Sequence, residues 1–399
     1  MEKDKIVVTG IGIISALGTG LKENLNALQN SECGISFLDS DSYISKFPFG
    51  KIHITNDTLI NNCIGYTEKS TTRNDALSKM AFQMAVEDGK LTTLEIQSKR
   101  TAFISASTVG GMDKHMDMYE DVKINTEHSQ YSASYSPSSH LQKIVTQYKI
   151  KGPTSVINTA CSSSANAIML GAKLLQQNKV DIAIVGGVDC LSDFTIRGFD
   201  ALGILTTDLC TPFDTSRLGL NLGEAAAYLV LKRDTKKNTD HKYGIISGWA
   251  NTNDSFHNSA LKEDGSGIMN CITKAISNAN LKVNDIKYIN AHGTGTYNND
   301  LAELTAISKL FPDDIRFSST KSYTGHTLAA AGVIESVFSL LGLINQEIYP
   351  SLNIKSPLIL NNKYQAITER SHLIFNHTLS NSFGFNGNCT SLIISKYEN

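Results

Sequence analysis

The apolar positions of the chain form two alternating kinds of run. Short stretches rich in β-branched residues and bounded by Gly, Asn or Ser predict strands, and they begin at Lys5, Thr101, Val180, Ile286 and Leu392. Between them, amphipathic stretches predict helices over residues 74–88, 162–177, 267–279, 300–310 and 327–344. Continuous apolar strands separated by amphipathic helices are typical of a layered α/β protein whose sheets are covered.

The pattern also repeats weakly within the chain. Four pairs of segments share their shape and their order: KIVVTGIGIIS with KYGIISGWANT, RTAFISASTVGG with IKYINAHGTGT, VINTACSSSANAIMLG with FSSTKSYTGHTLAAAGVI, and VDIAIVGGV with CTSLIISK. We therefore expect a duplicated unit, with halves 1–240 and 241–399 and a polar divide near residues 235–242. Corresponding loops of such halves lie around one pseudo-axis, so the unusual loops of both halves are expected to meet at one site.

Composition narrows the class of protein. The chain has 399 residues and a net charge of −2, from 36 basic and 38 acidic residues, which gives no support to nucleic-acid binding. Its seven cysteines are scattered without a C-x-x-C pair, which argues against a disulfide framework and against a metal knuckle. No signal-peptide core begins the chain, and the run VIESVFSLLGLI is too short to span a bilayer, so we expect a cytoplasmic protein that does not enter a membrane.

One cysteine stands out in the segment NTACSSSANAI. Cys161 lies among small polar residues where a predicted strand gives way to a helix. A thiol at the start of a helix meets unpaired N–H groups and the positive end of the helix dipole, which favour a nucleophilic thiolate. The alternative is a buried structural cysteine, as most free cysteines are.

Two loops of the C-terminal half carry candidate partners. His292 follows a predicted strand in NAHGTGT, and Lys321 and His326 flank a turn in STKSYTGHTLAAAGVIESV. Glu335 lies in the apolar helix that follows, and a buried carboxylate needs a partner, for which Lys321 is the obvious candidate. The alternative is a surface helix cap with an incidental Lys and His.

A last loop, NSFGFNGNCTSLII, precedes the final predicted strand. Gly384 and Gly387 permit unusual backbone angles, so the loop could present an N–H group to an oxyanion beside Phe383 and Phe385. Aromatic residues before a strand are otherwise core residues. One cysteine, two histidines and a lysine, with no nucleotide-binding loop and no metal-ligand spacing, favour acyl transfer through a thioester.

With these loops in view, the sequence resembles the β-ketoacyl-[acyl-carrier-protein] synthases, and among them the elongating enzymes with a Cys-His-His site on a thiolase-type fold. The resemblance runs from VVTGIGIISALG to NSFGFNGNCTSLIISK and includes KGPTSVINTACSSSANAI, PFDTSRLGLNLGEAAAYLVL, NAHGTGTYNNDLAE and SSTKSYTGHTLAAAGVIE. It implies a duplicated α-β-α-β-α arrangement of five layers, a homodimer, and condensation of an acyl chain with malonyl-[acyl-carrier protein]. It implies no cofactor beyond the phosphopantetheine of the carrier.

The resemblance also implies roles for the candidate residues. Cys161 corresponds to the acyl-accepting nucleophile, and His292 and His326 to the pair that supports decarboxylation. Lys321 corresponds to the residue that orders the site together with Glu335.

Further positions follow from the same resemblance. Phe385 corresponds to a gatekeeper whose N–H joins that of the cysteine in an oxyanion hole, and Val109 to a residue of the acyl pocket. Thr294 and Thr296 correspond to residues that meet the pantetheine arm, and Asp300 and Glu303 to acids that brace the histidine loop. Lys69 and Arg73 correspond to basic residues that dock the carrier.

The chain departs from the family pattern at several positions. Ser164 and Asn166 stand where Gly and His are common, and Asn386 and Asn388 interrupt the usual gate sequence. A ketosynthase subunit of a specialised polyene or polyketide pathway, paired with an inactive relative, is therefore an alternative to fatty-acid elongation. A thiolase, with Cys389 as its second cysteine, is a further one.

Overall fold

The computed structural model describes residues 4–37, 43–61, 63, 71–125, 129, 131–235 and 241–398. Within these ranges one large mixed sheet runs through the molecule. Six of its strands come from the N-terminal half: β1 (Ile6–Ser15), the short β2 (Gly18–Thr19) that pairs with it, β5 (Thr101–Ala106), β6 (Thr154–Ile157), β7 (Ile182–Asp189) and β8 (Ala225–Arg233). Five come from the C-terminal half: β9 (Gly244–Asn253), β10 (Tyr288–Asn290), β11 (Arg316–Ser318), β14 (His377–Gly384) and β15 (Asn388–Ser395).

The strand order repeats across the middle of this sheet. It reads β11-β10-β14-β15-β9 on one side and β1-β8-β7-β5-β6 on the other, with the same parallel and antiparallel pairings in each half. The halves join through a short pairing of β1 with β9, at Val7 with Ile245 and Val8 with Gly244. This order confirms the predicted duplication.

One of the four predicted segment pairs was wrong. The run VDIAIVGGV forms β7, whose topological equivalent is β14, whereas CTSLIISK lies in β15, the equivalent of β8. The strand β14, with sequence HTLSNSFG, is buried but rich in polar residues, so the apolar run of β7 resembles that of β15 more than that of its true equivalent. Most of the predicted divide near 235–242 lies outside the described residues.

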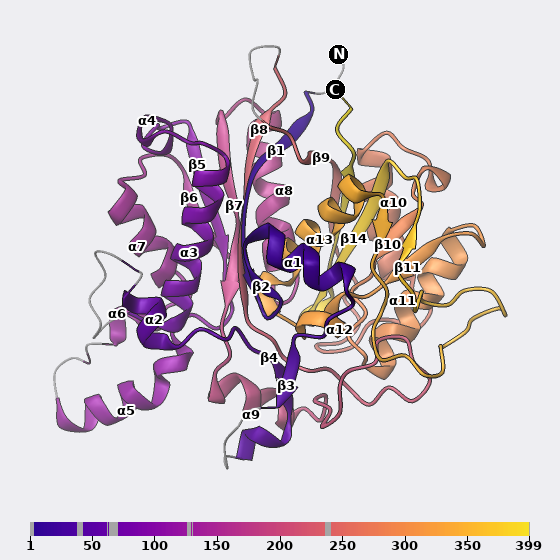
Figure 1. Cartoon of the computed structure of the whole chain (residues 1–399), viewed down its shortest axis with the longest axis horizontal. Helices are drawn as coiled ribbons and strands as arrows, with labels where there is room; N and C mark the ends of the chain where they lie inside the picture. The colour runs from indigo at the N-terminus through magenta and orange to yellow at the C-terminus, as the bar shows by residue number, and fades with distance from the viewer. Residues whose placement is uncertain are drawn as a thin grey trace.

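Helices cover both faces of each half-sheet (Figure 1). The outer layer of the N-terminal half contains α3 (Arg73–Asp88) and α7 (Ser139–Tyr148), and that of the C-terminal half contains α10 (Ser266–Asn278) and α11 (Tyr297–Leu310). Between the half-sheets lie α8 (Ser163–Gln176) and α13 (Ala331–Asn345), which pack on each other and on strands of both halves. The predicted five-layer arrangement is therefore confirmed, with the two central helices shared.

The central helices are buried because their sequences are apolar on nearly every side. Every residue of α13 from Ala331 to Leu343 is buried, and this includes Glu335. Among the described residues, Leu328–Asn345 is a stretch apolar and long enough to cross a membrane, a longer run than the sequence analysis allowed. In the fold, 89% of it is buried inside the protein, as the core helix of an α/β body.

Smaller elements decorate this body. They are α1 (Gly20–Gln29), α2 (Asn56–Asn61), α4 (Thr93–Ile96), α5 (His115–Ile124), α6 (Ser132–Tyr135), α9 (Asp193–Ala201), α12 (Lys321–Thr324), the short strands β2 (Gly18–Thr19), β3 (Ile35–Phe37), β4 (Pro48–Gly50), β12 (Glu347–Ile348) and β13 (Ser371–His372), and the 3-10 turns η1 (Tyr43–Lys46), η3 (Met112–Lys114), η4 (Val283–Asp285), η5 (Leu328–Ala330) and η6 (Phe385–Gly387).

Candidate active site

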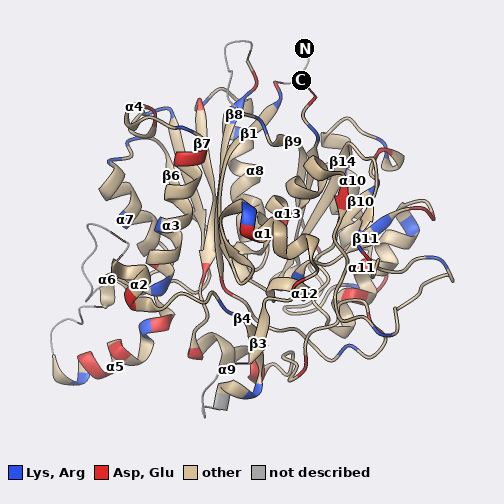
Figure 2. Cartoon of the chain, viewed as in Figure 1, with Lys and Arg blue, Asp and Glu red and all other residues tan. Residues whose placement is uncertain are grey.

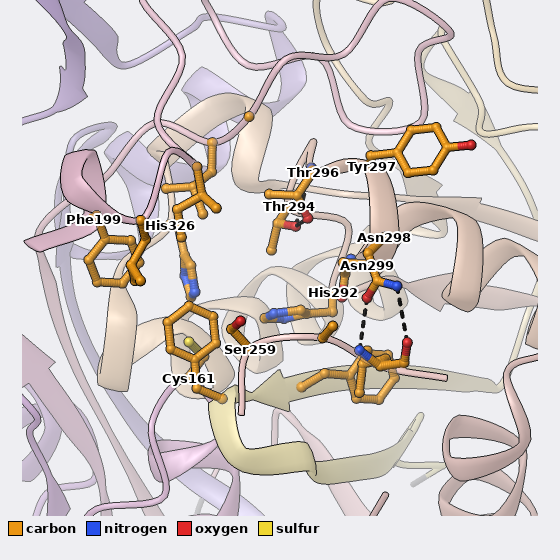
Figure 3. Close-up of a pocket in the computed structure, with 18 of the residues that line it drawn as sticks. Cys161, Phe199, Ser259, His292, Thr294, Thr296, Tyr297, Asn298, Asn299 and His326 are labelled. Carbon is orange, nitrogen blue, oxygen red and sulfur yellow. Dashed lines mark hydrogen bonds between the residues drawn. The ribbon is translucent and has the colours of Figure 1, made fainter. Parts of the chain in front are cut away.

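A cavity of about 440 Å³ opens where loops of the two halves meet. Cys161, His292 and His326 line it, and their side chains converge at its inner end (Figure 3). Each is nearly inaccessible, with 6%, 2% and 2% of its surface exposed. The structure therefore brings together residues from the two halves of the sequence, as the duplicated pattern predicted.

The loop between β6 and α8 holds Cys161 in a strained turn. Ala160, the residue before the cysteine, has φ = +53°, a left-handed conformation that is uncommon for a residue with a side chain. Ser163 Oγ donates to the carbonyl oxygen of Ala160 and accepts from the N–H of Thr159, at 2.5 and 2.9 Å. Helix α8 begins at Ser163, with Ser162 as its N-cap, so Cys161 lies just before the helix.

The predicted thiolate was wrong for this conformation. Burial raises the pKa of the Cys161 thiol to about 11, although the charge of Lys321 and the N–H of Phe385 act in the opposite direction. The cysteine precedes the helix and is fully enclosed, so loss of water outweighs the helix dipole. Only about one thiol in 10⁴ is ionised at pH 7.

The two histidines face each other as neutral rings. Their centroids are 5.4 Å apart and their planes nearly perpendicular, at 86°. Burial holds both pKa values well below the usual range for histidine, and the nearby charge of Lys321 lowers them further. Each ring therefore carries one proton and can donate one hydrogen bond.

Lys321 determines where that proton lies on His292. Its Nζ donates to Glu335 Oε1 at 2.5 Å, to the carbonyl oxygen of His292 at 2.6 Å and to His292 Nδ1 at 3.2 Å. An ammonium group can only donate, so Nδ1 is the acceptor and the ring proton is on Nε2. Burial raises the pKa of the Glu335 carboxyl group, and the attraction of Lys321 acts in the opposite direction.

Two further carboxylates hold the histidine loop. Glu303 accepts from the backbone N–H groups of His292 and Gly293, both at 2.9 Å. Asp300 accepts from the N–H of Gly295 at 3.2 Å, and the guanidinium of Arg217 lies 3.7 Å from it. Both acids come from α11, so the first two turns of that helix fix the loop before it.

Phe385 stands between the first cavity and a second one. The second cavity has about the same volume, 440 Å³, is mostly apolar, and shares Cys161, Phe199, Leu202 and Phe385 with the first. The rings of Phe385 and Phe199 are stacked with centroids 5.9 Å apart. Val109 lines this second cavity, called the inner cavity below, which also reaches the surface beside Phe194, a side chain 53% exposed.

The Phe385 loop packs directly against the cysteine loop. A Cβ atom on Gly384 would come within 2.6 Å of the Thr159 carbonyl oxygen, so only glycine fits there. The backbone N–H of Phe385 lies against the Cys161 sulfur. An oxyanion formed on an acyl group at Cys161 would thus lie near this N–H and that of the cysteine itself.

Two of the residues at which the sequence departs from the family pattern, Asn166 and Asn388, belong to one hydrogen-bonded cluster. Asn388 Oδ1 accepts from Ser162 Oγ at 2.7 Å, from Asn251 Nδ2 at 2.7 Å and from Asn166 Nδ2 at 3.2 Å. These bonds connect the end of the Phe385 loop to the start of α8. Asn166 and Asn388, at which the sequence departs from the family pattern, are therefore in direct contact with each other.

The outer end of the first cavity is polar inside and apolar at its rim. The hydroxyl groups of Thr294 and Thr296 lie 2.8 Å apart within the lining. At the rim, Leu202, Leu218 and Tyr297 are 56%, 73% and 69% exposed, and Tyr297 points away from the cysteine in Figure 3. The mouth is therefore bordered by apolar side chains.

Of the two basic docking residues inferred from the sequence, Arg73 does not line this cavity. Arg73 is only 7% exposed and its guanidinium is paired with Glu224, at 2.9 and 2.6 Å, so its assignment as a surface cation was wrong. The neighbouring Lys79 is also buried, at 3%. Lys69 lies outside the described residues. Lys and Arg are interspersed with Asp and Glu over the view of Figure 2 rather than gathered in one patch.

The sequence analysis missed the residues that wall the inner cavity from α9. Phe194, Phe199 and Leu202 belong to this helix or follow it directly. The signal was present: Ser192 caps the helix by accepting from the N–H of Thr195, and apolar residues follow at helical spacing.

Cys389 does not take part in the cavity. It is buried in β15, and its thiol donates to the carbonyl oxygen of Gly387. Among the described residues that line the first cavity, Cys161 is the one cysteine, so a thiolase site with a second cysteine is not formed. Nor does any group of three or more His, Cys, Asp or Glu in the described ranges form a metal-binding set.

Comparisons with known proteins agree with this geometry. Residues 3–237 match the model of the β-ketoacyl synthase N-terminal domain, and residues 243–355 that of the β-ketoacyl synthase C-terminal domain. The 3-oxoacyl-[acyl-carrier-protein] synthase 2 of Staphylococcus aureus (strain COL) is 28% identical, over 100% of this chain and 99% of its own.

Solved structures are similar over the whole chain. The ishigamide ketosynthase/chain length factor has a TM-score of 0.92 at 23% identity and covers 100% of both chains. A ketosynthase from Xenorhabdus doucetiae, solved in complex with its chain length factor, has a TM-score of 0.86 at 28% identity and covers 99% of this chain and 98% of its own.

Proposed function

The chain belongs to the β-ketoacyl synthase family, an acyltransferase family, and we propose that it condenses an acyl chain held on Cys161 with malonyl-[acyl-carrier protein], with loss of carbon dioxide. One observation supports this most: a buried cysteine and two neutral histidines converge on one cavity. The product is a 3-oxoacyl thioester on the carrier.

The first step loads the acyl chain. The sulfur of Cys161 attacks the thioester carbonyl of an acyl-carrier, the carbon–sulfur bond to the pantetheine breaks, and the pantetheine leaves as a thiol. One S–H group is consumed and one is formed, so the exchange is neutral overall and suits a thiol whose pKa is about 11. The N–H groups of Phe385 and Cys161 stabilise the oxyanion that forms in between.

The second step generates the carbon nucleophile. The malonyl thioester loses carbon dioxide, and the negative charge moves to the thioester oxygen as an enolate. His292 Nε2–H and the N–H of His326 donate to that oxygen, and a neutral donor in a buried site needs no rearrangement to do so. The enolate carbon then attacks the acyl carbonyl on Cys161, and the cysteine leaves as a thiolate that takes up a proton.

Lys321 and Glu335 support this step from behind His292. The ammonium group fixes the tautomer that leaves Nε2–H directed into the cavity. Glu303 and Asp300 hold the loop through its backbone N–H groups, which orients the ring without contacting substrate. We assign these residues positioning roles.

The cavities accommodate the substrates in sequence. We propose that Thr294 and Thr296 contact the pantetheine arm in the first cavity, and that the acyl chain lies in the second, beside Val109. The phosphopantetheine belongs to the carrier, so the chemistry requires no separate cofactor.

We propose an acyl carrier protein as the partner at the cavity mouth, where its arm must enter. The apolar rim of Leu202, Leu218 and Tyr297 would contact the body of the carrier. A second subunit, identical or related, is a further proposal; one of the similar structures is a ketosynthase in complex with its chain length factor. We place the enzyme in the cytoplasm because its seven cysteines form no disulfide framework.

A role in a specialised polyketide or polyene pathway is the second candidate. The Asn166–Asn388 cluster beside the nucleophile is the observation that favours it, since it changes the contacts of the gate. Fatty-acid elongation and this alternative differ in the acyl chain that is accepted, not in the chemistry.

The test is a ladder of acyl-carriers of increasing length and unsaturation. After each is offered, intact-protein mass spectrometry measures acyl transfer to Cys161, and malonyl-carrier is then added to measure the 3-oxoacyl product. We expect stoichiometric acylation followed by product with loss of one carbon dioxide. No acylation across the ladder, or acylation without product, would refute the proposed function.

A further inference from the structure

Asp189 is a fully buried carboxylate that the condensation does not use. It is the last residue of β7, is 0% exposed and lines neither cavity. Its Oδ1 accepts from Ser107 Oγ at 2.7 Å and from the N–H groups of Val109 and Thr108 at 2.9 and 3.0 Å. One oxygen thus holds the loop after β5.

The other oxygen reaches a distant segment. Oδ2 accepts from Thr108 Oγ1 at 2.5 Å and from the N–H of Ala329, in η5, at 2.8 Å. The carboxylate therefore ties the loop after β5 to the turn before α13, and these belong to different halves of the molecule. Backbone N–H groups, which can only donate, face both oxygens, a set that a carboxylate satisfies and a neutral amide of the same shape does not.

Both tethered segments form walls of the inner cavity. Val109 comes from the first and Leu328 from the second. Leu328 has φ = +53°, a conformation that costs free energy for a residue with a side chain and persists only where neighbours hold it. The bond from Ala329 N–H to Asp189 fixes the very next peptide.

We propose that Asp189 is a positioning residue that sets the separation of the Val109 and Leu328 walls, and through it the length of acyl chain that the enzyme accepts. This inference rests on the proposed function, because it takes the inner cavity as the acyl site. Asp189→Asn keeps the shape but turns an N–H group toward at least one of the donors, so one of the two walls loses its tether.

Asp75→Asn is the matched control. Asp75 is also a buried carboxylate, and it accepts from Ser139 Oγ and the N–H of Thr72, each at 3.0 Å. It lies between α3 and α7 and lines neither cavity. Loss of its charge should destabilise the fold without changing the walls of the inner cavity.

The experiment measures the rate at which N-alkyl iodoacetamides of increasing chain length alkylate Cys161, by intact-protein mass spectrometry. The ratio of long-chain to short-chain rates reports the depth of the inner cavity and requires neither carrier nor condensation. We expect Asp189→Asn to change this ratio by about tenfold, the effect of misfitting roughly one methylene group, and Asp75→Asn to leave it as in the wild type. A merely structural role would lower stability in both variants and move the ratio in neither.

An Asp189→Asn ratio equal to that of the wild type overturns the proposal. If this variant does not fold, Ser107→Ala removes a single hydroxyl donor to Asp189 at a residue that lines neither cavity, and an unchanged ratio in that variant overturns the proposal equally. A wild-type enzyme that is alkylated with a clear length dependence yet condenses no acyl-carrier would refute the proposed function and not the role of Asp189 in shaping the cavity.

Discussion

Two equivalent strand-to-helix loops of the fold carry the residues of the proposed chemistry, and these loops differ in length. The loop from β6 to α8 is short and places Cys161 directly before its helix. The equivalent loop from β11 to α13 is longer and contains α12 and η5, which gives room for Lys321 and His326. Under the proposed function, one position in a duplicated fold thus supplies either a nucleophile or its electrostatic support, according to the length of the loop.

The site has two corners, a cysteine corner formed by Cys161 and a histidine corner formed by His292 and His326. Burial shifts the pKa values of the two corners in opposite directions, with the same result. It raises the pKa of the cysteine and lowers the pKa values of the histidines, so that all three groups are neutral at pH 7. Charge is confined to Lys321 and Glu335 behind them. This separation predicts that a substitution in one corner abolishes the reaction step of that corner and leaves the step of the other corner intact.

The largest effect is expected from Cys161→Gln. Without a sulfur there is no acyl-enzyme, and condensation should fall by at least about 10⁴-fold. Carbon dioxide release from malonyl-carrier should persist, because the histidine donors are intact. Cys33→Ser, at an exposed cysteine, should retain both activities. If Cys161→Gln stops carbon dioxide release as completely as condensation, the two corners are not separable.

His326→Ala should disable the opposite corner. Removing one preorganised donor from the enolate should slow carbon dioxide release by about 10²- to 10³-fold. Acylation of Cys161, measured by mass, should change much less, since its oxyanion contacts the N–H groups of Phe385 and Cys161. His53→Ala, at an exposed histidine, serves as the control. An equal loss in both assays would contradict the comparison.

The pH dependence of the two corners should also differ. A thiol with a pKa of about 11 gains thiolate as pH rises, so alkylation of Cys161 by iodoacetamide should accelerate about tenfold per pH unit from neutral pH upward. Carbon dioxide release should stay flat between about pH 7.5 and pH 9, because both imidazoles are already neutral there. A plateau of the alkylation rate near neutral pH would show that the thiol is ionised after all.

The smallest effect is expected at the mouth that both corners share. Leu218→Ser should raise KM for acyl-carrier and malonyl-carrier alike, by about fivefold, as expected for the loss of about 1 kcal/mol of apolar contact. Small thioester mimics should be unaffected, and added salt should matter little. Leu94→Ser, at an equally exposed leucine on α4, is the control. A KM change for only one of the two carriers would mean that they dock at different places.

Much of this architecture could be predicted from local sequence. The helices at 74–88 and 162–177 were expected almost to the residue, because capping groups and apolar spacing determine where a helix begins and ends. The loops with Cys161, His292 and His326 were recognised because small residues and glycines interrupt apolar runs there. We expected these loops to lie at one site because the corresponding loops of two duplicated halves lie around one pseudo-axis.

The remainder depends on contacts that local sequence does not contain. The raised pKa of Cys161 comes from enclosure by loops of both halves, and Arg73 is buried because Glu224, far along the chain, pairs with it. The equivalence of β7 with β14 required the order of the strands in space. Each of these properties depends on long-range packing rather than on the neighbouring residues.

The ring of Phe385, placed between the two cavities, also has a consequence for the order of events in time. An acyl chain seated behind the ring leaves the outer cavity open, so a spent carrier must depart before the next one can insert its arm through the same entrance. Under the proposed function, the enzyme thus binds its two carrier-borne substrates one after the other through the same entrance. In steady-state kinetics this appears as a double-displacement pattern, with parallel double-reciprocal lines and inhibition by whichever carrier arrives out of turn.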